Sequence, residues 1–330
     1  MVESMESTSA ASARTGVEQS GEGVGVPTTG RLAVVVNPSK FGQLDAVKAE
    51  VGKVCRDAGW NDVAWYTTSA EDPGEGQTRQ ALAEGATVVC SLGGDGTVRS
   101  VASVLADTGV PLGLLPGGTG NLLARNLGLP VDDPMAALQI VLNGTTRRVD
   151  VGAVTWDDDA EEVFLVMAGM GMDARMIDDA DERVKNAVGW PAYVLSGVRA
   201  LFDPGFTVRA SAHGQHAKSQ RARMVVVGNC GQLTGGLKLL PDAQVDDGEL
   251  DVVVVAPQGI LGWVAVLRHV VTARRHDHRD LRRFSADSID VVTDRPILAQ
   301  LDGDAVGPRH RMTTRARPGA LLVQVPTLEG

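Results

Sequence analysis

Apolar and polar positions follow two different rhythms along the chain, and the change falls near residue 150. Before it, short apolar runs alternate with stretches in which apolar residues recur at helical spacing. The runs predict strands over Leu32–Val36, Val63–Thr67, Thr87–Leu92 and Pro111–Leu115, and the stretches between them predict helices over Leu44–Ala58, Gln77–Glu84 and Val98–Ala106. Apolar strands that alternate with helices indicate a parallel sheet covered on both faces, hence a three-layer α/β domain over residues 31–150.

After residue 150 the short apolar runs follow one another with few helices between them. They predict strands at residues 151–156, 163–168, 206–212, 224–229, 250–256, 288–293 and 321–325, with helices near residues 182–202 and 259–275. This pattern is typical of a β-sandwich or barrel. We therefore expect an α/β plus mainly β fold, with a β-sandwich-like domain over residues 151–311.

Composition supports a globular enzyme and excludes some other classes. The 330 residues suggest two domains, and a net charge of −10 argues against a general nucleic-acid-binding protein. The 39 glycines are about 12% of the chain, against ~7% on average, which indicates many tight loops. The three cysteines are scattered without metal-ligand spacing, so we expect buried thiols rather than a zinc site.

The N-terminal segment and the apolar stretches show no pattern of a signal peptide or a membrane span. Residues 1–30 carry four glutamates and one arginine among small polar residues, which predicts a disordered tail and not a signal peptide. The longest apolar stretch, Val252–Leu267, contains Pro257 and is too short to span a bilayer. We expect a cytoplasmic protein that is soluble or peripheral to the inner membrane face.

Three polar or glycine-rich loops follow predicted parallel strands, at the edge where such sheets bind ligands. They are Asn37-Pro38-Ser39, Gly93–Thr97 (GGDGT) and Pro116–Asn121 (PGGTGN), and a helix follows the last two. Glycines let backbone N–H groups approach phosphate oxygens, and a helix start adds partial positive charge. Asp95 is compatible with phosphate if it holds magnesium, a ribose hydroxyl or a neighbouring donor. The loops favour a nucleotide phosphate site over plain strand-to-helix turns.

The loops fit neither a Walker A loop nor a dinucleotide fingerprint, and no protein-kinase motif set is present. The ordered motifs resemble the diacylglycerol-kinase-like lipid kinase family over roughly residues 31–326. The matching segments are Asn37-Pro38-Ser39, GGDGT, PGGTGN with Leu122–Arg125, Asp150 with Gly152, Gly169-x-Gly171-x-Asp173-Ala174, Leu240–Ala243, Asp246–Asp251 and Asp302-Gly303-Asp304.

This resemblance implies ATP bound in the cleft between two domains of the NAD-kinase/diacylglycerol-kinase-like fold. The γ-phosphoryl group would pass to a lipid hydroxyl, with diacylglycerol as the expected acceptor. It also implies that residues 312–330 return to the first domain. By position, the residues that would bind the nucleotide are Asn37, Pro38, Ser39, Lys40, Phe41, Thr68 (or its neighbour Thr67), Gly93, Gly94, Asp95, Gly96, Thr97, Val98, Arg99, Ser100, Gly117, Gly118, Thr119, Gly120 and Asn121.

The resemblance also assigns a metal loop. Asp247 would serve a structural or activating magnesium ion, with main-chain oxygens of Gln244 and Glu249 beside it. An oxygen-rich turn suits this hard cation. The alternative is a solvated hairpin turn, because Asp-Asp-Gly is also a good turn sequence.

For the catalytic centre, Asp304 occupies the family's general-base position. Asp302 lies two residues earlier, and on a strand both carboxylates would face one site. The family's base is usually glutamate, so which aspartate would contact the hydroxyl stays open. Leu122 stands where many relatives carry aspartate, and Asp150 is a candidate to supply that carboxylate.

Two further segments suggest lipid contact. Leu261–Arg283 has six arginines and an apolar first half, so it predicts either a basic amphipathic helix on an anionic membrane or a core helix with a solvated end. Lys185–Phe202 would line an acyl pocket or belong to the core. We expect a lipid partner, no nucleic acid and a possible homodimer. Alternatives are an NAD kinase, a sphingoid or other lipid-alcohol kinase, and a non-catalytic binding protein.

Overall fold

The computed structural model describes residues 24–25, 30–171, 205–212, 219–233, 238–272 and 280–327. The helical elements are η1 (Pro38–Lys40), α1 (Leu44–Asp57), α2 (Glu75–Ala83), α3 (Asp95–Leu105), α4 (Leu122–Asn126), α5 (Pro134–Asn143) and α9 (Gly259–Val271). The strands are β1 (Val24–Gly25), β2 (Arg31–Val36), β3 (Asp62–Thr67), β4 (Val88–Gly93), β5 (Leu112–Pro116), β6 (Thr145–Trp156), β7 (Glu162–Phe164), β8 (Met167–Gly171), β9 (Phe206–Ala212), β10 (Gln220–Ala222), β11 (Met224–Gly228), β12 (Leu250–Val255), β13 (Leu281–Ala286), β14 (Ser288–Leu301) and β15 (Asp304–Val325).

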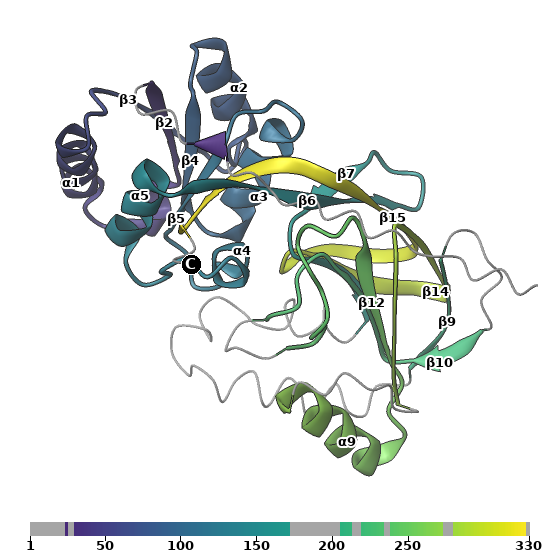
Figure 1. Cartoon of the computed structure of the whole chain (residues 1–330). Helices are drawn as coiled ribbons and strands as arrows, with labels where there is room; N and C mark the ends of the chain where they lie inside the picture. Colours follow the sequence, from purple (N-terminus) through teal and green to yellow (C-terminus); the bar gives the residue numbers. More distant parts are fainter. Residues whose placement is uncertain are drawn as a thin grey trace, which may run out of the picture.

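The first part is a parallel sheet between two layers of helices (Figure 1). Its strands lie in the order β5-β4-β2-β3, all parallel. In β2, Leu32, Val34 and Val36 pack into the cluster with α1 and α5, whereas Ala33 and Val35 pack into the cluster with α2 and α3. A strand that is covered on both faces needs an unbroken apolar sequence, and this one reads LAVVV.

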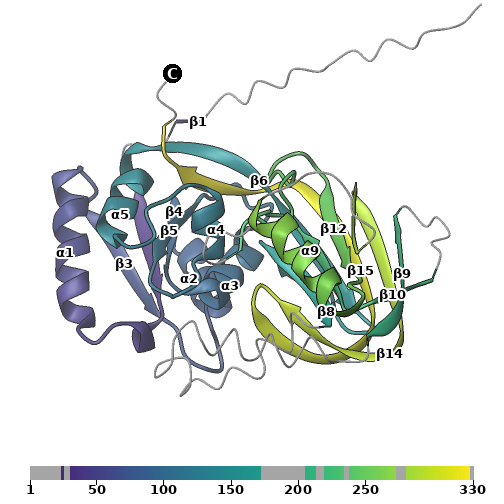
Figure 2. The same cartoon turned by 90° about the horizontal axis from the view of Figure 1, so that it is seen from below.

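Three long strands connect this part to the rest of the molecule. β15 pairs with β14 and with β6 along its length, and near its end Val323 pairs with Leu112 of β5. One hydrogen-bonded sheet therefore runs from β13 to β3. β6 passes residue 150 without a break, so the domain boundary that we predict there lies inside a strand. Figure 2 shows β6 and β15 together above the helices.

The second part is mainly β, as predicted, with a core of its own. β8, β11, β12 and β13 pair antiparallel, and Trp156 and Phe164 are its largest fully buried side chains. The mixed α/β domain followed by a β-sandwich-like domain is thus confirmed. The predicted helix near residues 182–202, with its suggested acyl pocket, and the Asp173-Ala174 motif lie outside the described residues.

Two predicted elements in this part are wrong. Residues 163–168 are not one strand: β7 ends at Phe164 and β8 begins at Met167, because the intervening backbone N–H groups turn to a carboxylate described below. Residues 261–283 are not one helix, since α9 ends at Val271 and residues 281–286 form β13, which pairs with β12.

The remaining expectations concern the tail, the cysteines and the membrane. Residues 1–23 and 26–29 lie outside the described part, but Val24 and Gly25 pair with β6, which the expectation of a tail did not include. All three cysteines are buried free thiols, as expected. In the described ranges, no helix is both long and apolar enough to cross a bilayer.

Candidate active site

Three loops meet at the carboxyl ends of β2, β4 and β5. The Asn37 N–H donates to the Leu92 carbonyl over 3.0 Å, and the Gly117 N–H donates to the Gly93 carbonyl over 3.0 Å. The Asn37 side chain accepts bonds from the Ser39 N–H and hydroxyl, at 3.1 and 2.7 Å, which fixes the first loop as a single 3₁₀ turn. The first loop lies more than 50 residues before the other two in the sequence, and the parallel sheet brings all three to one edge.

The glycines of the second and third loops are required by close contact between the loops. A Cβ atom on Gly118 would lie 2.7 Å from the Cα atom of Gly94, and one on Gly117 would lie 2.6 Å from the Phe41 ring. Both distances are below any real Cβ contact. The loops therefore form one continuous backbone surface at this edge of the sheet.

Because of this contact, Gly118→Ala is expected to separate the two loops and to weaken ATP binding by about tenfold or more, a loss of ~1.4 kcal/mol. Gly42→Ala is the matched control, since nothing lies within 4 Å of its added Cβ and its φ is not in the left-handed region. Isothermal titration of ATP into both variants tests this. Equal affinities would contradict the required contact.

Asp95 connects the second and third loops. Its carboxylate accepts a 2.6 Å bond from the Leu122 N–H at the start of α4. Of the three roles considered for Asp95, the structure displays the bond to a neighbouring donor. Burial raises the pKa of Asp95, the bonds from α4 oppose this, and the charge of Asp304 raises it further. α3 begins at Asp95, directly after Gly94, and the first N–H groups of a helix favour an anion.

The other predicted nucleotide residues divide by exposure. Ser39, Lys40 and Thr119 lie exposed at the loop tips, whereas Thr97, Val98 and Ser100 are buried in α3. The Ser100 hydroxyl donates to the Gly96 carbonyl over 3.0 Å, so it stabilises the helix start rather than facing solvent. Gly120 lies against the Asp95 carboxylate, and Asn121 bonds back to Gly118 in both directions, so both are structural in this conformation.

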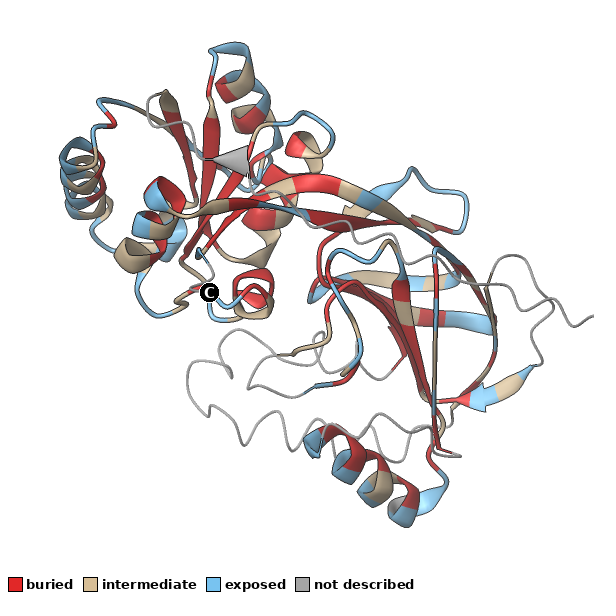
Figure 3. Ribbon diagram, viewed as in Figure 1, coloured by how far each residue is buried: buried red, intermediate tan, exposed pale blue. Residues whose placement is uncertain are grey.

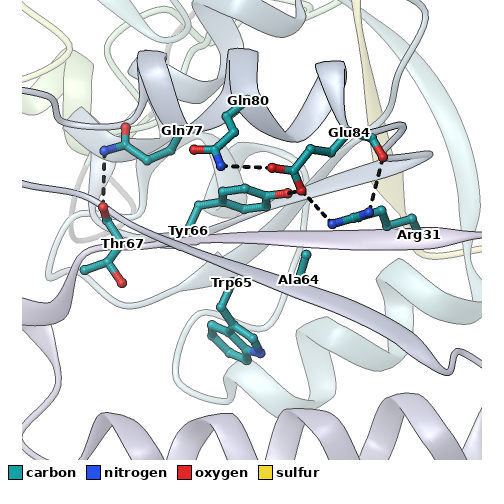
Figure 4. Close-up of a pocket in the computed structure, with 8 residues that line it drawn as sticks. All are labelled: Arg31, Ala64, Trp65, Tyr66, Thr67, Gln77, Gln80 and Glu84. Carbon is teal, nitrogen blue, oxygen red and sulfur yellow. Dashed lines mark hydrogen bonds and ion pairs between the residues drawn. The ribbon is translucent and has the colours of Figure 1, made fainter.

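Thr67 and Thr68 lie in different surroundings. Thr68 is buried and its N–H donates to Val36, next to the first loop. Thr67 lines a polar hollow between β3 and α2, where its carbonyl accepts from Gln77 (Figure 4). In that hollow Tyr66, Gln80 and Arg31 all bond to Glu84, so its central carboxylate is already satisfied. Thr68 is therefore the one beside the loops.

Asp304 lies over the first turn of α3. Its carboxylate pairs with Arg99 at 2.8 Å, and a Cβ atom on Gly96 would lie 3.4 Å from the same oxygen. Arg99 also donates to the Leu301 carbonyl over 2.6 Å. The Asp304 side chain is 58% exposed, so its carboxylate is accessible to a substrate. The resemblance assigns Arg99 to the nucleotide site and carries no signal for its pair with Asp304, which lies 205 residues away.

Asp302 has a different environment from Asp304, and the expectation that both lie on one strand face is wrong. Asp302 and Gly303 have φ values of 48° and 91° and form the two-residue turn between β14 and β15. The Asp302 carboxylate is buried and accepts bonds of 2.8–2.9 Å from the N–H groups of residues 165, 166 and 167. Burial raises the pKa of Asp302, against the lowering effect of Arg99 and these N–H groups.

The predicted metal loop lies at the other end of α3. Asp150 is buried and accepts from Gly248 and from Gly319, each over 2.7 Å, and the next residue, Ala320, accepts from Asp107 just after α3. With 11 residues, α3 is about 16 Å long. Asp150 therefore holds this loop in place and does not supply a carboxylate near Leu122.

Asp247 itself is exposed and accepts a 3.0 Å bond from the Glu249 N–H. Burial raises the pKa of Asp247, and the charges of Glu249 and Asp150 add to this effect. No group of three metal-binding side chains occurs among the described residues, so a cation here would depend on one carboxylate and on main-chain oxygens.

Both parts of the chain resemble known protein domains. Residues 31–154 match the diacylglycerol kinase catalytic domain, and residues 166–325 match the YegS C-terminal NAD kinase beta sandwich-like domain. A probable lipid kinase YegS-like protein of Pseudomonas fluorescens is 32% identical, over 90% of this chain and 96% of its own length. A diacylglycerol kinase of Mycobacterium tuberculosis is 33% identical, over 68% of this chain and 72% of its own length.

The similarity extends to solved structures. A putative diacylglycerol kinase from Bacillus anthracis superposes with a TM-score of 0.70 at 24% identity, over 89% of this chain and 97% of that one, which supports the fold. An uncharacterised protein of Synechocystis is longer: the chain covers 52% of it at 28% identity. The two matched domains and the full-length relative show that the chain belongs to the diacylglycerol-kinase-like family of lipid kinases, enzymes that phosphorylate a lipid.

Proposed function

We propose that this lipid kinase transfers the γ-phosphoryl group of ATP to the hydroxyl of diacylglycerol and forms phosphatidic acid. The observation that carries the proposal is the position of the Asp304 carboxylate over the first turn of α3, beside the contact between Gly94 and Gly118. A carboxylate and an anion-binding helix start at one place are what phosphoryl transfer to an alcohol needs. The relative from Mycobacterium tuberculosis, named a diacylglycerol kinase, supports this acceptor.

In this proposal each loop has one task. The N–H groups that follow Gly94, together with the third loop, hold the phosphates of ATP. Asp304 orients the lipid hydroxyl and takes its proton as the oxygen bonds to the γ-phosphorus, while the bond to the bridging oxygen of ADP breaks. Asp302 fixes the turn that carries Asp304. Positioning and charge neutralisation supply most of the catalysis in such reactions, so the shorter aspartate suffices.

The proposal includes two magnesium ions at different sites. With ATP, the ion would neutralise charge on the phosphates. At the loop of Asp247, a second ion would be held by that carboxylate and by main-chain oxygens of Gln244 and Glu249. The oxygen-only donor set fits a hard cation. This loop and the first turn of α3 lie at opposite ends of the helix, so the second ion would stabilise the loop and take no part in the chemistry.

Labelled ATP with magnesium tests the acceptor directly. We expect label in lipid extracts when diacylglycerol is supplied, and little with sphingoid bases, isoprenoid alcohols or NAD. Mass spectrometry of the product then identifies phosphatidic acid. If the label appears in a sphingoid or isoprenoid phosphate, that alcohol replaces diacylglycerol as the proposed acceptor. If NADP is the only labelled product, the proposal is overturned.

Arg99 is proposed to be a positioning residue that acts through Asp304. Without it, the Asp304 carboxylate loses the side-chain partner that holds it over the helix start and rotates away. We expect Arg99→Gln to lower kcat by about tenfold to a hundredfold. A purely structural role would lower the melting temperature instead and leave the pH profile of kcat unchanged. The check is a pH profile of kcat for Arg99→Gln and Arg99→Lys, in which lysine restores part of the rate.

A further inference from the structure

One helix carries the exposed apolar surface of the described part of the chain. The large apolar side chains that are exposed there are Leu261 (83%), Val264 (58%), Leu267 (61%) and Val271 (62%). All four belong to α9 and recur every three or four residues, so they form a single stripe along the helix. Figure 3 displays the exposed edge of α9 on the outer side of the molecule.

The opposite side of α9 already packs against the protein. Val266 and Val270 are buried in the first core cluster, with Trp263 partly buried beside them. α9 is therefore apolar on both sides, although half of it faces outward. A helix that is apolar all round belongs in a core or at a lipid surface, because solvent-exposed apolar area of this kind is unfavourable.

The charges around the stripe differ from those of the whole chain. α9 contains no acidic residue, and its last turn carries Arg268, which is exposed. The sequence from Arg268 to Arg283 holds six arginines and two aspartates, in a chain whose net charge is −10. Of these arginines, Arg274, Arg275 and Arg279 lie outside the described residues, and Arg282 and Arg283 belong to β13. An apolar stripe with an exposed arginine at its end and no acidic residue on its helix matches a bilayer that contains anionic lipids. A second copy docked on the same face would bring like charges together, which is unfavourable.

We propose that α9 is the membrane-docking element of this enzyme: Leu261, Val264, Leu267 and Val271 enter the interface of an anionic bilayer, and Arg268 in its last turn contacts the headgroups. α9 lies at the far end of the second part from α1–α5 and faces the viewer in Figure 2. Docking through it would bring the bilayer, which holds the acceptor lipid, to the mainly β part of the enzyme. The activity test below rests on the proposed diacylglycerol acceptor.

The binding test uses flotation of the full chain with vesicles of phosphatidylcholine, alone or mixed with phosphatidylglycerol. The double variant Leu261→Ser/Leu267→Ser is expected to bind mixed vesicles about tenfold or more weakly, because binding scales with the apolar area that enters the interface. Leu261→Met/Leu267→Met keeps that area and is expected to bind like the wild type. The wild type should prefer mixed vesicles, and added salt should reduce this preference.

The activity test separates docking from catalysis. With diacylglycerol in mixed vesicles, the double serine variant should lose activity in proportion to its binding. With a short-chain, water-soluble diacylglycerol, it should match the wild type, which also demonstrates correct folding. If the serine variant floats as strongly as the wild type, docking through α9 is overturned even if the kinase is active. Docking is also overturned if the wild type is a dimer that the serine substitutions dissociate. If the serine substitutions weaken flotation but the enzyme phosphorylates no lipid, docking through α9 is supported and only the proposed diacylglycerol acceptor is excluded.

Discussion

Asp304→Ala is expected to lower kcat for lipid phosphorylation by about 10²–10⁴-fold, the range for loss of a general base. The carboxylate is accessible and lies over the start of α3, so its removal takes away the group that we propose accepts the hydroxyl proton. ATP affinity should stay within about twofold, because the phosphate loops make their contacts without Asp304. A labelled-ATP assay and isothermal titration measure the two quantities.

Two matched variants sharpen this result. Asp304→Glu keeps a carboxylate and should recover much of the rate, whereas Asp304→Asn keeps the size but not the proton acceptor and should resemble alanine. Because the pair with Arg99 is largely solvent-exposed on the Asp304 side, the free energy of unfolding should change by no more than about 1 kcal/mol in all three. An active alanine variant would remove Asp304 from the chemistry.

The parts of the site that could be predicted from the sequence are those that local pattern determines. The apolar runs of β2, β4 and β5 are typical of fully buried strands, and glycine-rich segments directly after such strands lie at one edge of a parallel sheet. For that reason the sequence predicts that the loops at Gly93 and Gly117 share one edge of the sheet, where the structure has them. Their mutual contact depends on strand order, which the pattern does not contain.

The parts that could not be predicted depend on contacts between distant residues. Asp302-Gly303-Asp304 is compatible with both a strand and a tight turn, and only the pairing of β14 with β15 decides for the turn. Likewise, Asp150 accepts hydrogen bonds from Gly248 and Gly319, which lie 98 and 169 positions away in the sequence. No local sequence pattern therefore indicates that Asp150 holds the predicted metal loop. The basic sequence of β13 is also compatible with the end of a helix, and only its pairing with β12 shows that it forms a strand.

Asp302→Ala is expected to destabilise the fold rather than to affect catalysis alone. Its buried carboxylate is the acceptor for three backbone N–H groups, two between β7 and β8 and one at the first residue of β8. An unpaired buried donor costs about 1–3 kcal/mol, so losing the acceptor for all three should lower the free energy of unfolding by roughly 3 kcal/mol or more. Urea unfolding followed by circular dichroism measures this change.

Asp304→Ala is the matched control for this prediction, since it removes an exposed carboxylate two residues away. The two variants should therefore separate: Asp302→Ala unfolds at lower urea but retains ATP binding while folded, and Asp304→Ala unfolds like the wild type but is inactive. Asp302→Asn keeps one acceptor oxygen and should fall between Asp302→Ala and the wild type. If Asp302→Ala unfolds at the wild-type urea concentration with an unchanged slope, the three N–H groups have another acceptor, and Asp302 becomes a candidate for direct contact with the substrate hydroxyl.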